Sequence, residues 1–142
     1  MSFLTEIRRF SFKIKIKLFL IIVAATVLHL LLKMISFKSV VAFLSRRKTR
    51  KSAQKPEALV KHYSQLMSAC NHFHSYLYKC LALSVLFWFL LRRHEVDVEM
   101  KFGMYKEAGK MHFHAWLEYH GQPLATDEGA KEKYISFPES IV

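Results

Sequence analysis

Cys80 immediately precedes an apolar stretch, Leu81–Leu91, that is followed by two arginines. A thiolate rather than a thiol attacks a carbonyl carbon, so a nucleophilic cysteine needs surroundings that favour its ionised form. The N-terminus of a helix provides such surroundings through its dipole and its unpaired N–H groups, which can also bind an oxyanion. Cys80 is therefore a candidate nucleophile, although its position alone is equally compatible with a structural role. Cys70 falls on the apolar face of the preceding helical pattern, which predicts a core thiol.

A histidine and an aspartate face each other in a hairpin that the C-terminal part of the chain predicts. With His120-Gly121 as a two-residue loop, Tyr119 pairs with Gln122 and His114 lies opposite Asp127. Counting outward from the loop makes this a non-hydrogen-bonded pair, in which the Cα atoms are about 4.5 Å apart and the side chains share a face. An aspartate in that position can orient an imidazole and stabilise its charged form, as in catalytic triads.

Other arrangements of the same residue types are weaker candidates. Glu118 shares a strand face with His114 but lies about 13 Å along the strand, too far for a direct contact. A zinc site is conceivable from Cys80 with the His112 and His114 pair, or from Cys70 with His72 and His74. No paired-cysteine zinc spacing is present, so we predict neither a metal nor a cofactor. Five histidines are interpreted as surface or satisfied core residues: His62, His72, His74, His94 and His120.

Helices followed by an antiparallel sheet are expected to position these residues. From Pro56 onward apolar residues recur at helical spacing, and Leu81–Leu91 is apolar nearly all round, as in a buried helix. The period then changes to two over 96–104 and 111–119, which predicts two strands, with a turn at 106–110 and a third strand from Gln122. This order predicts an α+β domain.

The N-terminal part predicts a helical appendage, residues 1–55, ahead of a catalytic domain at 56–142. A basic segment, Ser2–Lys17, precedes the apolar run Leu18–Leu32, and a second apolar stretch leads into the basic connector Ser45–Lys55. The apolar run has fifteen residues, whereas a spanning helix needs about 20. We therefore favour a buried or interface helix and keep peripheral membrane contact through Leu18–Leu32 as an alternative.

Composition indicates the class of partner and the cellular compartment. The 142 residues carry 22 Lys and Arg against 11 Asp and Glu, so the surface should attract acidic partners. No nucleic-acid-binding module accompanies this charge, and we expect no nucleic-acid partner. Two cysteines are too few for a disulfide scaffold, and the apolar run is not followed by a signal-peptide cleavage site. We expect a cytoplasmic protein, with membrane association as the alternative.

The motifs together resemble the stand-alone lasso-peptide leader peptidases, the transglutaminase-like B proteins that mature microcin-type lasso precursors. The resemblance covers nearly the whole chain, and its specific part spans Cys80–Gly121. It is carried by Cys80-Leu81-Ala-Leu-Ser84, Leu90-Leu91-Arg92-Arg93, Lys101-Phe102-Gly103 and His114-Ala115-Trp116-Leu117-Glu118.

The resemblance implies a transglutaminase-like, papain-like cysteine protease fold with a catalytic triad of Cys80, His114 and Asp127. It further implies cleavage of the leader from a ribosomally made precursor peptide, a separate leader-binding protein, and a cyclase that then closes the ring. Glu95 stands where the family usually has glycine, so the resemblance does not fix how the chain leaves the preceding helix. An acyl transferase and a non-catalytic membrane-associated scaffold are the alternative functions.

Overall fold

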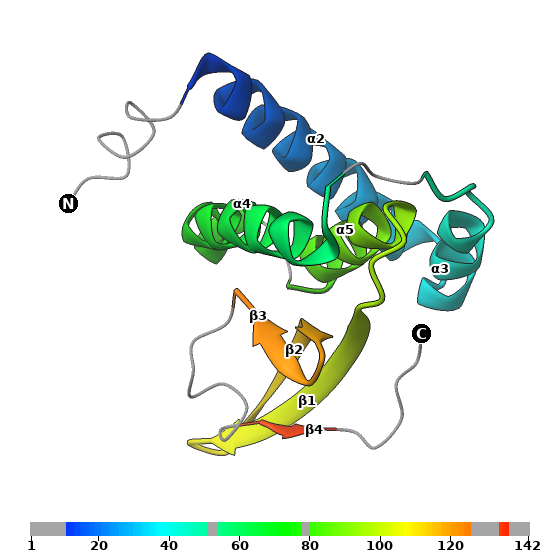
Figure 1. The fold of residues 1–142 in the computed structure, drawn as a ribbon. Coiled ribbons are helices and arrows are strands. Elements are labelled where there is room, and N and C mark those ends of the chain that lie inside the picture. Colours follow the sequence, from blue (N-terminus) through cyan, green and yellow to red (C-terminus); the bar gives the residue numbers. More distant parts are fainter. Residues whose placement is uncertain (1–10, 51–53, 78–79, 126–133, 137–142) are drawn as a thin grey trace.

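The computed structural model describes residues 11–50, 54–77, 80–125 and 134–136, with the backbone alone for residues 71–77 and for Cys80. Helices form one side of the molecule and an antiparallel sheet the other (Figure 1). The helices are α2 (Phe12–Met34), α3 (Phe37–Ser45), α4 (Pro56–Leu77) and α5 (Cys80–Arg93). The strands are β1 (Glu99–Glu107), β2 (Lys110–Tyr119), β3 (Gln122–Leu124) and β4 (Ile135–Ser136), in the order β3-β2-β1-β4. The predicted α+β class is confirmed.

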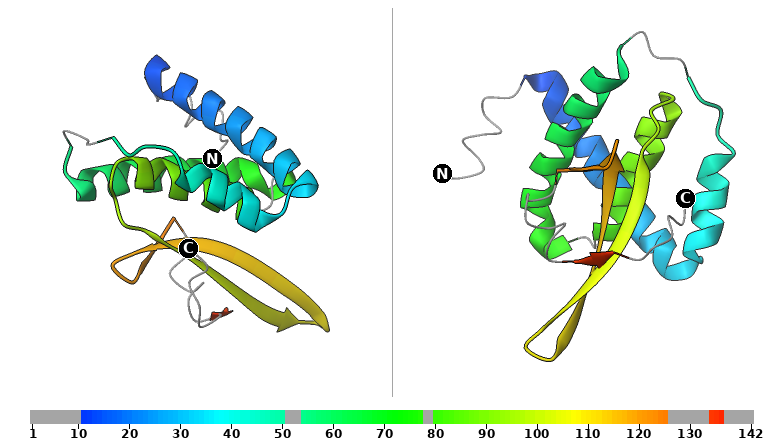
Figure 2. Two further views of the ribbon diagram at one scale, coloured as in Figure 1. Left: turned by 90° about the vertical axis from the view of Figure 1, so that its right-hand side faces the viewer. Right: turned by 60° about the horizontal axis from the view of Figure 1, so that its bottom comes forward.

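Helix α5 lies between the other helices and the sheet. Its residues from Ala82 to Trp88 are all buried, as the uninterrupted apolar sequence predicts. Helix α2 packs on the face of α5 away from the sheet, α4 and α3 flank it, and strands β2 and β1 cover its other face (Figure 2). Helix α5 is therefore the central element of the fold.

The C-terminal end of α5 closes in a Schellman motif. The N–H of Val96 donates to the carbonyl of Leu91, and the N–H of Glu95 donates to the carbonyl of Arg92. Glu95 has a φ of 60°, the left-handed conformation that usually selects glycine at this position. The helix exit therefore keeps the geometry of a glycine cap although a glutamate occupies it.

Two tight hairpins build the sheet. Ala108 and Gly109 connect β1 to β2, and His120 and Gly121 connect β2 to β3; all four residues have positive φ, as type I′ turns require. The predicted loop at His120-Gly121 and the pairing of Tyr119 with Gln122 are confirmed. Strand β1 begins at Glu99 and runs to Glu107, so the first hairpin loop is tighter than the predicted turn at 106–110.

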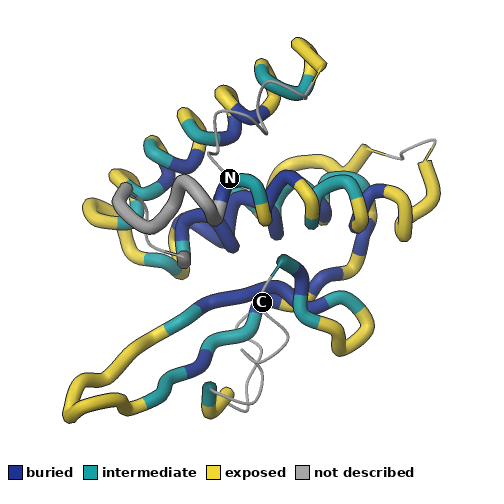
Figure 3. Tube along the Cα trace, turned by 90° about the vertical axis from the view of Figure 1, so that its left-hand side faces the viewer, coloured by how far each residue is buried: buried dark blue, intermediate teal, exposed yellow. Residues whose placement is uncertain are grey.

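Helix α2 is longer than the apolar run from which it was predicted, and it buries only one of its faces. Leu18, Ile21, Ala25 and Leu28 are buried in the same core as α5 and the sheet. Buried and exposed positions alternate along the helix in Figure 3. By length and composition α2 is apolar enough to cross a membrane. Residues before and after position 56 thus share one core, and the predicted division of the chain at this position stays a prediction.

Two adjacent alanines test the packing of α2. Ala25 is fully buried, whereas its neighbour Ala24 is exposed. We expect Ala25→Leu to lower the free energy of unfolding by about 1–3 kcal/mol because added methylenes have no space in a packed core. Ala24→Leu should change it by less than about 0.5 kcal/mol. Urea denaturation of both variants measures the difference, and equal stabilities would contradict the described orientation of α2.

Candidate active site

Cys80 is the first residue of α5, the position that the sequence predicts for a nucleophile. Ser84 lies four residues later and therefore on the same face of the helix, one turn along. The Ser84 side chain is fully buried, and its hydroxyl donates a hydrogen bond of 3.0 Å to the carbonyl oxygen of Ala115 in β2. The helix face that carries Cys80 is thus turned towards β2.

The contact with Ser84 falls on an edge of β2. Tyr119 and Leu117 pair with β3, and the alternation of an antiparallel ladder directs the carbonyl of Ala115 to the same side. Strand β3 ends at Leu124, which pairs with Leu117, so the ladder stops before it reaches Ala115. The hydroxyl of Ser84 binds this carbonyl beyond the end of β3, and α5 thereby approaches the strand next to His114.

The side chain of His114 lies on an aromatic face of the sheet. Its ring stacks on Tyr134, with a centroid distance of 5.0 Å, and is nearly parallel to Trp116 at 6.0 Å. Leu117 alternates onto the opposite face, where it joins the core with α5. For the Cys80 sulfur to contact the imidazole, the two would therefore have to meet at the edge of β2 beyond Leu124. The pairing of these two side chains stays a prediction.

Gly103 allows the aromatic face to close. It pairs with His114 across β1 and β2. A Cβ atom on Gly103 would lie 2.9 Å from Cη2 of Trp116 and 3.0 Å from Cβ of Tyr134. The missing side chain thus leaves room for the indole ring. No sequence pattern marks Tyr134 as a site residue, and it reaches His114 because β4 pairs with β1 at Gly103.

Asp127 lies outside the described residues. The hairpin register on which its prediction rests is confirmed as far as Leu124, and the next residue, Ala125, leaves the strand with a φ of 52°. The pairing of His114 with Asp127 stays a prediction. Glu118 is buried, and its carboxylate accepts a hydrogen bond of 3.0 Å from the indole N–H of Trp116.

Cys70 and the histidines of the two zinc alternatives are the other candidate functional residues. Cys70 is buried, as predicted, and burial raises the pKa of its thiol to about 11. Among the residues whose side chains are described, no group of three His, Cys, Asp or Glu is arranged to hold a metal ion. His112 instead stacks on Tyr105. The side chains of Cys80, His72 and His74 lie outside the description, so the zinc alternatives stay untested.

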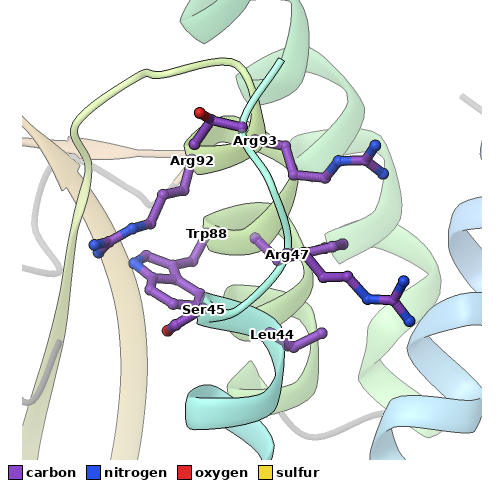
Figure 4. Close-up of a pocket in the computed structure, with 8 residues that line it drawn as sticks. Leu44, Ser45, Arg47, Trp88, Arg92 and Arg93 are labelled. Carbon is purple, nitrogen blue, oxygen red and sulfur yellow. The ribbon is translucent and has the colours of Figure 1, made fainter.

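Two cavities lie away from Cys80 and His114. The smaller, of about 30 Å³, is at the C-terminal end of α5, where the Arg92 guanidinium lies over the Trp88 ring at 5.2 Å (Figure 4). The larger, of about 360 Å³, is lined by Lys17, His62, Tyr63 and His94 among others. Burial and the charge of Lys17 lower the pKa of His62 there. Neither cavity contains a residue predicted to act in catalysis.

Comparison with known families identifies one match. The model of the family described as the Transglutaminase-like superfamily matches residues 22–137, a range that includes Cys80, His114 and Asp127. Neither the curated proteins nor the solved structures gave a significant match.

The hydrogen bond between Ser84 and Ala115 is testable by a matched pair of substitutions. We expect Ser84→Ala to lower the free energy of unfolding by about 1–2 kcal/mol because a buried bond between two elements is lost. The hydroxyl of Ser45 also donates to a main-chain carbonyl, that of Val41, but within its own helix and at an exposed position. Ser45→Ala should therefore change stability by less than about 0.5 kcal/mol in the same urea titration. Equal effects would show that the Ser84 bond does not hold α5 on β2.

Proposed function

The chain belongs to the transglutaminase-like superfamily, and from this premise we propose that it is a cysteine peptidase that removes the leader from a lasso-peptide precursor. Members of the superfamily are usually enzymes of the cysteine protease or acyltransferase type. The observation that carries the proposal is the hydrogen bond from Ser84 to Ala115, because it links the helix that begins at Cys80 to the residue beside His114. The choice of a lasso precursor rests on the motif resemblance.

The proposed reaction passes through an acyl-enzyme. The Cys80 sulfur attacks the carbonyl carbon of the last leader residue as His114 accepts the thiol proton. Unpaired N–H groups at the start of α5 stabilise the oxyanion that forms. The imidazolium then protonates the leaving amine, which becomes the free N-terminus of the core peptide. Water, deprotonated by His114, hydrolyses the thioester and releases the leader. In this scheme Asp127 orients the imidazole, stabilises the imidazolium and remains ionised throughout.

An acyl transferase would use the same first half-reaction. In that case an amine rather than water attacks the thioester, and the two outcomes differ in product mass, since hydrolysis adds one water molecule. We favour hydrolysis because the ring-closing step in the resembled system needs a free amine and belongs to a separate cyclase.

We propose that a separate leader-binding protein delivers the substrate to this enzyme in the cytoplasm. The described residues share one core, to which α2 and α3 contribute, and form no second unit of the size a peptide-binding domain needs, at least about 50 residues. Tethering by a partner raises the effective concentration of the precursor without new contacts in the site. The net charge of +11 suits an acidic leader or partner.

The two cysteines give the central test of the mechanism. Cys80→Ala should reduce precursor cleavage by roughly 10³-fold or more because the nucleophile is lost. Cys70→Ala should retain cleavage apart from a packing loss, since a thiol with a pKa of about 11 is protonated at neutral pH. Mass spectrometry of the products measures cleavage by both variants. An essential Cys70 with a dispensable Cys80 would refute the assignment of the nucleophile.

A titration tests the delivery proposal. A candidate leader-binding protein is added at fixed enzyme concentration, and the cleavage rate is measured at each step. A rate independent of the added protein would refute the delivery proposal.

Substitutions of two acidic residues distinguish a carboxylate that orients the imidazole from one that supports packing. Asp127→Asn should lower kcat substantially because the charge that stabilises the imidazolium is removed. Glu118→Gln should lower it less, since the Gln side-chain oxygen can still accept the bond from Trp116. Single-turnover cleavage rates compare the variants, and thermal unfolding reports any loss of packing. If Glu118→Gln impaired turnover more than Asp127→Asn at equal stability, Asp127 would not be the orienting acid.

A further inference from the structure

Helix α2 carries a continuous apolar stripe on the face opposite its buried side. No described element covers this stripe, and Figure 3 shows exposed positions along the helix where it turns away from the rest of the molecule. Phe19 is 65% exposed and Met34 is 85% exposed, and a contiguous exposed apolar patch of this kind marks an interaction surface. The stripe consists of Phe12, Ile16, Phe19, Leu20, Val23, Val27, Leu30, Leu31 and Met34.

The spacing of the stripe suits a flat surface. The set Phe12, Ile16 and Phe19 recurs eleven residues later as Val23, Val27 and Leu30. Three apolar positions per eleven residues is a period of about 3.67, close to the 3.6 residues per turn of a straight helix. The stripe therefore runs along one side of α2 for about 33 Å without winding around it. A left-handed coiled coil with a second helix needs a period of 3.5 instead, so a second copy is the less suitable occupant.

Lysines border the stripe on both sides. At 100° per residue, Lys13 and Lys17 fall along one border, and Lys15 and Lys33 fall along the other. Their aliphatic stems can extend beside apolar surface while the ammonium groups reach outward. The chain has no Asp or Glu between Glu6 and Glu57, so α2, α3 and the basic connector form a region of uniform positive charge. An apolar stripe with a cationic border is complementary to an anionic lipid surface.

The packing of α2 favours a helix that lies in the membrane plane. Its inner face, including the fully buried Ala25, is part of the core with α5. A spanning orientation would pull this face off the protein and expose the apolar side of α5 that it covers. The segment between Lys17 and Lys33 is also only about 22 Å long, against about 30 Å for the hydrocarbon core of a bilayer.

We propose that α2 docks the protein on an anionic membrane surface, with the helix axis parallel to the bilayer and the stripe inserted at the boundary of the headgroups and acyl chains. The lysines on its borders contact lipid phosphates. The sheet lies on the far side of the α4 and α5 layer from α2 (Figures 1 and 2), so this orientation leaves His114 and the edge of β2 accessible from the aqueous side. The proposal concerns lipid binding and is independent of the reaction at Cys80.

Flotation of the full-length protein with vesicles tests the docking. Wild type should float with vesicles of phosphatidylcholine and phosphatidylglycerol, and much less with phosphatidylcholine alone. Phe19→Asp should weaken partitioning at least tenfold, and Lys13→Gln with Lys17→Gln should weaken it about fivefold for each lysine. Phe113→Asp is the matched control, because Phe113 is 68% exposed but lies on β2, and it should not change partitioning. Circular dichroism and thermal unfolding establish that each variant is folded.

Failure of the wild type to float with anionic vesicles would overturn the proposal, as would equal losses for Phe19→Asp and Phe113→Asp. Sedimentation without lipid adds a further check. If wild type were a dimer that Phe19→Asp dissociates, and if it did not bind vesicles, the stripe would be an interface between copies of this chain.

Cysteine labelling separates an in-plane helix from a spanning one. Ser11→Cys and Ser36→Cys introduce a thiol just before and just after α2, each in a background with Cys70→Ala and Cys80→Ala. A membrane-impermeant maleimide added outside vesicles should label both positions at similar rates if the helix lies in the plane. Protection of one position with labelling of the other would show that α2 spans the bilayer and would overturn the proposed orientation.

Discussion

The apolar circumference of α5 is the constraint from which the rest of the architecture follows. A helix that is apolar on every side is stable only when other elements cover all of it. Helix α2 covers the face of α5 away from the sheet, α3 and α4 flank it, and the hairpin of β1 and β2 covers the remaining face (Figure 2). Each fully buried side chain, such as Phe87 or Leu91, contributes about 1.5–3 kcal/mol relative to an exposed one. Most of the contact between the helices and the sheet therefore runs through α5, and the ring contact of Phe37 in α3 with Phe102 in β1 adds to it.

This central helix also fixes where the predicted nucleophile lies relative to the sheet. Other elements pack along the whole length of α5, so the direction of its N-terminus is fixed. The positive end of the helix dipole therefore lies at Cys80, one turn before Ser84 contacts β2. The aromatic face around His114 depends on an independent feature, the absence of a side chain at Gly103. The candidate site thus combines a helix terminus on one side of the strand with an imidazole held by aromatic rings on the other.

The two outer surfaces of the molecule differ in character. The exposed side of α2 is apolar with a basic border, whereas the face of the sheet away from α5 carries His114 and Tyr134, both half-buried, next to the buried Trp116. The α4 and α5 layer separates these surfaces. A peptide substrate and a membrane could therefore be engaged simultaneously, because neither contact would occupy the surface that the other needs.

The sequence by itself determined the features that depend on neighbouring residues. The loop at His120-Gly121 is set by the local preference for positive φ, and the burial of α5 and Cys70 is set by apolar periodicity. Only the tertiary structure decided which face of α2 is covered and that the hydroxyl of Ser84 binds the Ala115 carbonyl. It also brought Tyr134 to His114 through the pairing of β4 with β1. Those contacts join residues far apart in the chain, so their formation depends on how whole elements pack, and no local pattern encodes it.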